Sequence, residues 1–212
     1  MKVYQLDDDY AKLRKKTWPK AFKLALILVG MMWVIYFLDF IFPFVDFYRF
    51  GIYPRDINGL IGIITAFFLH GSMSHLISNT LPILLAITAL FGNYPTTAKK
   101  VLVFSILLTG LMVWSFARSA NHIGASGVLY SLLAYIFFSG FIKKDMQSIG
   151  ISIVIAFLYG SLIFGVIPSD KGVSWESHLF GFIVGIFLAW LYKEKDKPIY
   201  KSWEDDDGDV EY

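Results

Sequence analysis

The sequence predicts an all-α membrane protein, a bundle of six spanning helices, and its composition and apolar pattern carry this prediction. Hydrophobic residues make up 56% of the 212 residues and charged residues only 17%. A soluble globular domain carries roughly 25% charged residues, so much of this surface is expected to face lipid. Apolar runs of about the 20 residues that a spanning helix needs recur six times along the chain.

The six apolar runs are the candidate spans. They cover residues 21–42, 68–91, 100–116, 126–142, 148–167 and 178–192. The segment between the first two runs, residues 43–60, mixes aromatic side chains with charged ones and is too polar to span a membrane. We expect it to lie at the interface, with Phe47, Tyr48 and Tyr53 near the lipid headgroups.

The distribution of basic residues predicts the orientation of the spans. If the N-terminus is cytoplasmic, six spans leave outside only four of the 19 Lys and Arg residues, namely Arg49, Arg55, Arg118 and Lys171. This asymmetry follows the positive-inside rule. An odd number of spans would destroy it, so the charge pattern supports the count of six.

Both ends of the chain are polar. Residues 1–20 lack the short apolar core and small-residue cleavage site of a signal peptide, and the acidic end of the chain is typical of disorder. The expected layout is a cytoplasmic tail at 1–20, a six-helix membrane domain at 21–192 and a charged cytoplasmic tail at 193–212. Chain size and the lack of targeting segments favour a bacterial plasma membrane.

Composition also excludes several functions. The formal net charge of +2 is too small to indicate a nucleic-acid partner. The absence of cysteine excludes disulfides, thiolate metal sites and a cysteine nucleophile. A transporter built from two related halves is disfavoured, because the sequence shows no internal repeat. No oligomeric state is predicted.

Three polar segments interrupt the apolar runs, at residues 70–79, 124–130 and 178–185. Polar groups at membrane depth are costly and usually face a protein interior or a wet cavity. Counted at about 1.5 Å per residue from the predicted inner helix ends, four of these residues share a layer about 17–24 Å above the inner edge. The four residues are Ser126, His178, His75 and Asn79.

The residue types in that layer favour nucleophilic catalysis. A serine hydroxyl is a weak nucleophile unless a base takes its proton, and a histidine such as His178 is the side chain best suited to that role near neutral pH. A tetrahedral intermediate also needs hydrogen-bond donors for its oxyanion. His75 and Asn79 lie four residues apart, on one helix face, and the Ser126 amide at a helix start lacks an intrahelical partner. Such a reaction needs neither a metal nor a cofactor.

Glycines and one tyrosine surround these residues in the sequence. Gly124 and Gly127 permit close backbone approach. Gly181 and Gly185 form a small-xxx-small face, which favours tight packing of the last helix. Tyr130 lies one turn after Ser126 and is expected to stack against the imidazole of His178. This stacking would orient the base without an acidic residue as a third member of the site.

The three segments resemble the rhomboid family of intramembrane serine proteases. They carry H-G-S-x-x-H-x-x-x-N at 70–79, G-x-S-G at 124–127 and H-x-x-G-x-x-x-G at 178–185, in family order, and the resemblance covers about residues 21–192. It implies that Ser126 is the nucleophile and His178 the general base. It also implies that His75, Asn79 and the Ser126 amide form the oxyanion site and that Tyr130 packs on the histidine.

The implied activity is cleavage of peptide bonds in or near the transmembrane segment of single-span membrane proteins, within the lipid bilayer. An inactive client-binding relative of the derlin kind is the alternative, although such relatives lack the serine or the histidine. A proton relay through His75 and His178 is disfavoured, because no acidic partner lies in the middle of the spans.

Four further residues receive weaker expectations. His70 is expected to have a structural or cavity role, and His122 to be solvated in a loop. Glu176 lies two residues before His178 and is expected to point elsewhere. Arg49 receives no role, because the tryptophan–arginine pair of the family's first loop is absent around it.

Overall fold

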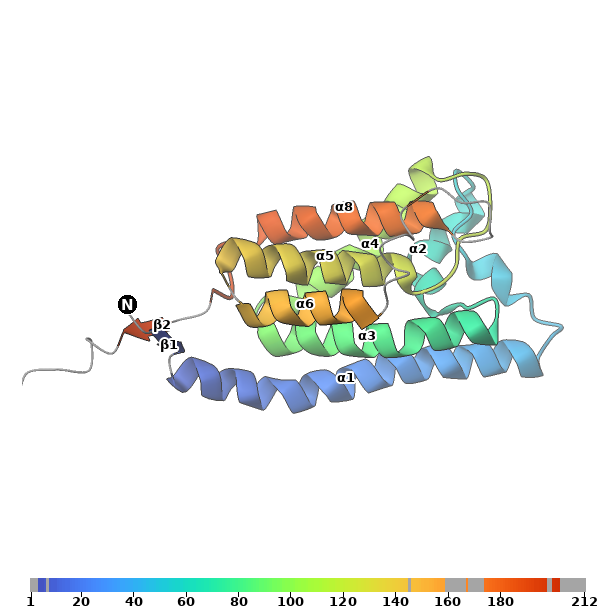
Figure 1. Ribbon diagram of the computed structural model, residues 1–212. Coiled ribbons are helices and arrows are strands. Elements are labelled where there is room, and N and C mark those ends of the chain that lie inside the picture. The colour runs from blue at the N-terminus through green and yellow to red at the C-terminus, as the bar shows by residue number, and fades with distance from the viewer. Residues whose placement is uncertain are drawn as a thin grey trace, which may run out of the picture.

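Long helices lie side by side along one axis in the computed structural model (Figure 1), which describes residues 4–6, 8–144, 146–158, 167, 174–197 and 200–202. The long helices of this part of the chain are α1 (Asp8–Ile41), α3 (Met73–Asn93), α4 (Ala98–Phe116), α5 (Ser126–Lys143), α6 (Met146–Leu158) and α8 (Trp175–Leu191). The strands β1 (Tyr4–Leu6) and β2 (Tyr200–Ser202) pair antiparallel beyond one end of the bundle. The predicted all-α class is confirmed.

Four of these helices are long and apolar enough to cross a membrane. They are Lys15–Ile41 within α1, and α3, α4 and α5 over their full lengths, while α8 is apolar but shorter. The last predicted span, residues 178–192, lies on α8 and the residue that follows it. In the predicted fifth span, α6 is described to Leu158, and residues 159–166 lie outside the described residues. The chain is a multi-pass membrane protein.

The predicted start of the second span was wrong. That span was expected from residue 68, but α3 begins at Met73, because Ser72 adopts an extended conformation and its side chain accepts a hydrogen bond from the amide of His75. Serine at this position satisfies one of the amides that a helix start leaves unpaired. Apolar content alone did not reveal this cap. Because α3 begins at Met73, His70 lies before the helix rather than inside it.

The segment between α1 and α3 forms short helical turns. They are η1 (Phe47–Phe50), η2 (Ile57–Ile61), α2 (Gly62–Thr65) and η3 (Ala66–Phe68). Tyr48 and Tyr53 are 44% and 48% exposed, and their place near the lipid headgroups stays a prediction. Arg55 attaches the segment to α4, since its guanidinium donates to the carbonyl of Ala117 at 2.8 Å.

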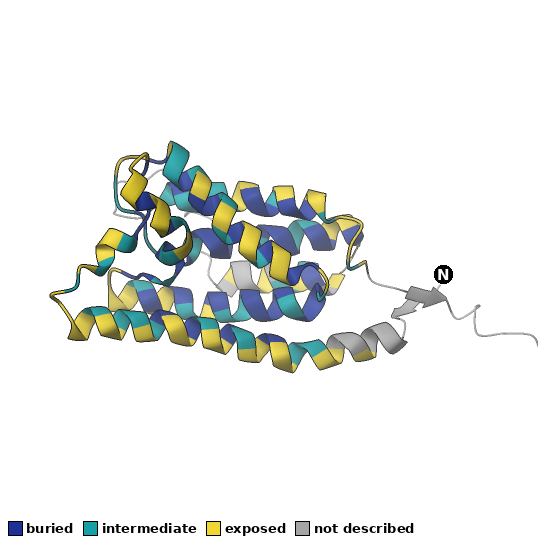
Figure 2. Cartoon of the chain, turned by 180° about the vertical axis from the view of Figure 1, so that it is seen from behind, coloured by how far each residue is buried: buried dark blue, intermediate teal, exposed yellow. Residues whose placement is uncertain are grey.

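The helix α5 occupies the centre of the bundle and α1 its periphery. Buried residues make up 67% of the most apolar window of α5 but only 17% of that of α1. Figure 2 shows the same contrast, with an exposed outer face along α1 and dark blue, buried positions along α5. In a lipid bilayer such an exposed apolar face contacts acyl chains, so α1 is a lipid-facing helix.

Glycines permit a close contact between α5 and α8. A Cβ atom on Gly181 would collide with the carbonyl oxygen of Gly127, and one on Gly185 would collide with that of Ser131. Small residues allow this approach between membrane helices. The α8 backbone therefore rests directly on α5 at Gly181 and Gly185.

The opposite end of α8 is tied to the start of α4. Asp196, just beyond α8, accepts hydrogen bonds from the amides of Thr96 and Thr97, each at 3.0 Å. It also accepts from both threonine hydroxyls, at 2.7 and 2.6 Å. A carboxylate at a helix start is favoured by the unpaired amides and by the helix dipole. The hydrogen bonds of Asp196 hold the C-terminal end of α8, and the contact at Gly181 and Gly185 holds the helix along its length.

Substitution Gly181→Ala is expected to lower the free energy of unfolding by about 1–3 kcal/mol, the usual cost of overpacking. Gly30→Ala in α1 is the matched control, because its Cβ would meet no atom within 4 Å, and alanine is the better helix former. Chemical denaturation in detergent measures both. Equal destabilisation of the two variants, or none in Gly181→Ala, would contradict the packing described here.

Candidate active site

A serine and a histidine from different helices meet at one end of the bundle. Ser126 is the first residue of α5, and His178 lies in the first turn of α8. His178 Nε2 lies 2.7 Å from Ser126 Oγ, and His178 is only 7% exposed. Both helices begin at the end of the bundle opposite the β1–β2 pair (Figure 1). The two residues that the sequence singled out, 52 positions apart, are therefore hydrogen-bonded.

The turn before α5 aims Ser126 at α8. Gly124 has a φ of +114°, a conformation that side chains with a Cβ rarely adopt. Its amide donates to the carbonyl of Ala66 at 2.8 Å, which anchors the turn to η3. The helix then starts at Ser126 without a side-chain cap. Within the described residues no hydrogen bond uses the Ser126 amide, as expected at a helix start.

Tyr130 stacks on the imidazole of His178. The ring centroids are 4.3 Å apart and the planes differ by 11°. Tyr130 lies one turn after Ser126, so a single face of α5 presents both the hydroxyl and the ring. Tyr130 is only 6% exposed, and its burial restricts the rotation of the ring that it presents to His178.

His75 and Asn79 both lie on α3, but the structure places them differently. The His75 ring lies against Gly124, since a Cβ built there would be 2.7 Å from His75 Cε1 and 2.8 Å from Nε2. His75 is thus adjacent to the turn that carries Ser126. Asn79 is buried, and its Nδ2 donates to the His75 carbonyl at 2.9 Å. A primary amide has a second N–H, so this bond leaves Asn79 one further donor.

His70 is buried behind His75. It is 5% exposed, and the two rings meet edge to face at 4.9 Å between centroids. Burial, reinforced by the neighbouring His75 and partly offset by a hydrogen bond to the Phe68 carbonyl, lowers the pKa of His70 to about 4. His70 is therefore neutral at ordinary pH.

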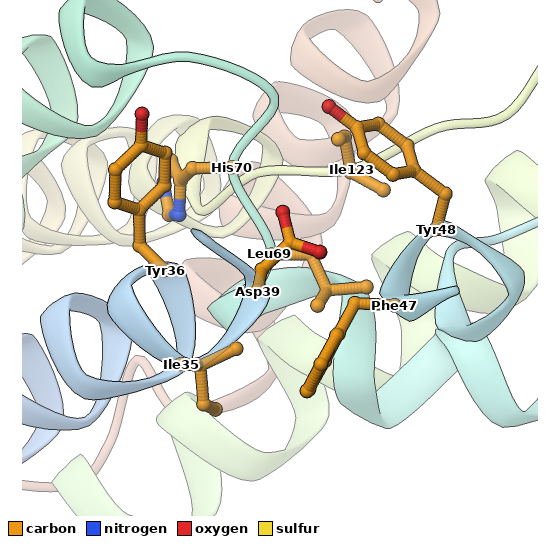
Figure 3. Close-up of a pocket in the computed structure, with 8 residues that line it drawn as sticks. All are labelled: Ile35, Tyr36, Asp39, Phe47, Tyr48, Leu69, His70 and Ile123. Atoms are coloured by element: carbon orange, nitrogen blue, oxygen red, sulfur yellow. The ribbon is translucent and has the colours of Figure 1, made fainter. Parts of the chain in front are cut away.

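A hollow of about 240 Å³, including the space at its open mouth, lies between α1, η1 and the residues before α3. Figure 3 shows the side chains around it, among them Tyr36 and Asp39 from α1, Tyr48 from η1, and His70. Ser126, His178, His75 and Asn79 do not line it. The hollow is therefore separate from the serine–histidine pair.

The expectation that His122 is solvated was wrong. His122 is 2% exposed, and its Nδ1 lies 2.6 Å from Ser174 Oγ while its Nε2 lies 3.0 Å from the Arg118 carbonyl. Its position in a polar loop suggested exposure, but segments far away in the sequence cover it. No local pattern around His122 indicates this burial, because its partners Ile52 and Ser174 lie far from it in the sequence.

Charged side chains of α8 and of the segment between α1 and α3 form contacts of their own. Glu176 is buried, and its Oε1 lies 3.5 Å from Arg118 Nε. Arg49 lies over the Phe50 ring, 4.8 Å from its centroid. Arg55, to which the sequence analysis gave no role, is the arginine that joins this segment to the end of α4.

A partly buried serine and a buried histidine, hydrogen-bonded at one end of an apolar helix bundle, define a class: multi-pass membrane proteins with the side chains of a serine hydrolase. The family model described as the rhomboid domain matches residues 58–195, more than half of the chain. The chain belongs to the rhomboid family, which is a family of the intramembrane-protease type.

Relatives with similar sequences occur in mycobacteria. Proteins of Mycobacterium bovis and Mycobacterium tuberculosis, both described as uncharacterized, are 32% identical over 158 residues, covering 69% of this chain and 65% of each relative. An uncharacterized protein of Mycobacterium leprae is 32% identical over 173 residues, covering 69% and 62%. The chain thus spans slightly less than two thirds of the length of these relatives.

The pKa of His70 predicts a dependence of stability on pH. Because burial lowers this pKa from 6.5 to about 4, the unfolded chain binds a proton more readily between these values. The neutral, buried His70 contributes fully to the free energy of unfolding above pH 6.5. Below pH 6.5 this contribution declines, by up to roughly 1.4 kcal/mol per pH unit. Thermal unfolding between pH 7 and 5 should show a shallower decline for His70→Gln than for the unchanged chain. Equal slopes would contradict the assignment.

Proposed function

We propose that this protein is an intramembrane serine endopeptidase that cuts single-span membrane proteins in or near their transmembrane segments. The observation that carries the proposal is the 2.7 Å approach of His178 Nε2 to Ser126 Oγ. This distance lies within the usual range for a nucleophile and its general base. The rhomboid domain match supports the same reaction class.

The proposed reaction is acyl transfer to water. Ser126 Oγ attacks the carbonyl carbon of the scissile bond while its proton passes to His178 Nε2. His178 then protonates the leaving amine as the C–N bond breaks, which leaves an ester on Ser126. His178 takes a proton from a water molecule that attacks the ester, and collapse of this second intermediate releases the acid and returns the proton to Ser126. Assistance by a general base contributes about 10²–10⁴ in rate.

The negative charge of the tetrahedral intermediate needs donors near Ser126. The Ser126 amide, the second N–H of Asn79 and the His75 ring are the proposed donors, and each good donor contributes roughly 2.7–4 kcal/mol. The contact of His75 with Gly124 and the burial of Asn79 support this role. Tyr130 would hold the imidazole plane by stacking.

The substrate enters this site from the bilayer. Its helix has to unwind locally, because a helical peptide bond is screened by its own turn, and glycine or proline near the cut would ease unwinding. With both chain ends cytoplasmic, Ser126 and His178 lie towards the outer face of a bacterial plasma membrane. The positive-inside asymmetry of the basic residues supports this orientation.

A serine-directed fluorophosphonate tests the nucleophile and the base. We expect Ser126→Ala to abolish labelling of the detergent-solubilised protein, and His178→Ala to reduce it by at least about 10². Ser139→Ala, which removes a buried serine near the other end of α5, is the matched control and should label normally. Labelling that persists in Ser126→Ala would rule out this serine as the nucleophile.

A model single-span substrate separates a protease from a client carrier of the derlin kind. If the protein is a protease, the unchanged chain should cut the substrate into two fragments, and Ser126→Ala should leave it intact. Binding of the substrate by the unchanged, folded chain without cleavage would support the carrier reading instead.

The oxyanion role predicts unequal effects of neighbouring substitutions on α3. Asn79 Nδ2 and Ser78 Oγ both donate to the His75 carbonyl, each at 2.9 Å, but only Asn79 is buried. Asn79→Ala should lower kcat by about 10²–10³ with little change in KM, whereas Ser78→Ala should leave both constants near the original values. Comparable losses in the two variants would refute the oxyanion role of Asn79.

A further inference from the structure

A chain of hydrogen bonds joins the loop before α5 to the start of α8, with His122 at its centre. The Arg118 carbonyl can only accept, so the proton of the neutral ring lies on His122 Nε2, which donates to it at 3.0 Å. His122 Nδ1 is then an acceptor. It accepts a hydrogen bond from the Ser174 hydroxyl across 2.6 Å.

Ser174 is the N-cap of α8. Its oxygen accepts from the Ser177 amide at 3.4 Å and lies 2.6 Å from the Ser177 hydroxyl. The carbonyl of Ser174 accepts from the amide of His178, also at 3.4 Å. The residue that His122 holds is therefore one helical turn from the proposed base and hydrogen-bonded to its backbone.

The backbone of His122 is itself fixed. Its N–H and carbonyl pair with Ile52 in both directions, at 2.9 and 3.0 Å. The adjacent Asn121 donates to the Tyr48 carbonyl at 2.7 Å. His122 thus presents its ring from a loop anchored on the segment between α1 and α3, four residues before Ser126.

The surroundings of the ring keep it neutral. Burial is the largest effect and lowers the pKa of His122, and the nearby Arg118 guanidinium lowers it further. The hydrogen bond to the Arg118 carbonyl and the charge of Glu176 on α8 act in the opposite direction. Only a neutral ring can accept a hydrogen bond from the Ser174 hydroxyl at Nδ1.

We propose that His122 is a positioning residue, which holds the start of α8, and with it His178, against the loop that carries Ser126. The glycine contact sets the distance between α5 and α8. The first turn of α8 precedes Gly181 in the sequence, so this contact does not prevent that turn from fraying or shifting. The bond to Ser174 restrains that turn. The inference rests on the proposed function, because a displacement of about 1 Å can cost about 10² in rate.

Substitution of His122 by asparagine or by glutamine tests its two side-chain hydrogen bonds one at a time. An asparagine places its amide atoms near the position of Nδ1 and can still bond Ser174, whereas a glutamine reaches towards Nε2 and the Arg118 carbonyl. We expect His122→Ala and His122→Gln to slow fluorophosphonate labelling of Ser126 by roughly 10- to 100-fold. His122→Asn should restore the rate to within a few fold of the original.

Matched substitutions of Ser174 test the same bond from its other side. Glycine is nearly as good an N-cap as serine but cannot bond His122, while threonine keeps the hydroxyl. Ser174→Gly should therefore slow labelling and Ser174→Thr should not. This pair decides the question if the His122 variants do not fold.

Hydrogen exchange provides a measurement that does not depend on activity. Amides of residues 174–180 should exchange at least about tenfold faster in His122→Ala and Ser174→Gly, and near the original rate in His122→Asn. Unchanged exchange and labelling in His122→Ala, or equal losses in the Asn and Gln variants, overturn the inference. Absence of labelling in the unchanged chain overturns the proposed function, while the exchange comparison still decides whether His122 holds α8.

Discussion

The direct contact between the backbones of α5 and α8 is the constraint on which the site depends. Gly181 and Gly185 leave no space for a Cβ against the carbonyls of Gly127 and Ser131. Lipid chains are as apolar as the helix surfaces, so close packing rather than exclusion of water must hold these helices together. At this separation the first residue of α5 and the first turn of α8 are close enough for the 2.7 Å bond between Ser126 and His178.

Close packing alone does not orient an imidazole. Two groups outside the pair restrict it from different directions: Tyr130 stacks on its face at 4.3 Å, and the His122–Ser174 bond ties down the turn that carries it. A third acidic residue performs this task in a serine–histidine–aspartate triad. In the proposed mechanism the ring contact and the capped helix start take the place of that acid, while Glu176 pairs with Arg118.

The site could be predicted from the sequence wherever helical spacing determines proximity. The i,i+4 relations of His75 with Asn79 and of Ser126 with Tyr130 follow from helical geometry, and the glycines of α8 indicate its contact face. The environment of His122 could not be predicted, because its partners Ile52 and Ser174 lie far away in the sequence. The start of α3 was predicted too early because the apolar run continues upstream of Ser72. Only the side-chain cap formed by Ser72 marks where the helix begins.

The most direct measurement of the central claim is an experimental structure of the protein after reaction with a fluorophosphonate. The account predicts phosphorus bonded to Ser126 Oγ, the His178 ring on the same side and within hydrogen-bonding distance of the adduct, and a phosphonyl oxygen facing the Ser126 amide. An adduct on another residue, or an imidazole of His178 turned away from the modified serine, would contradict it.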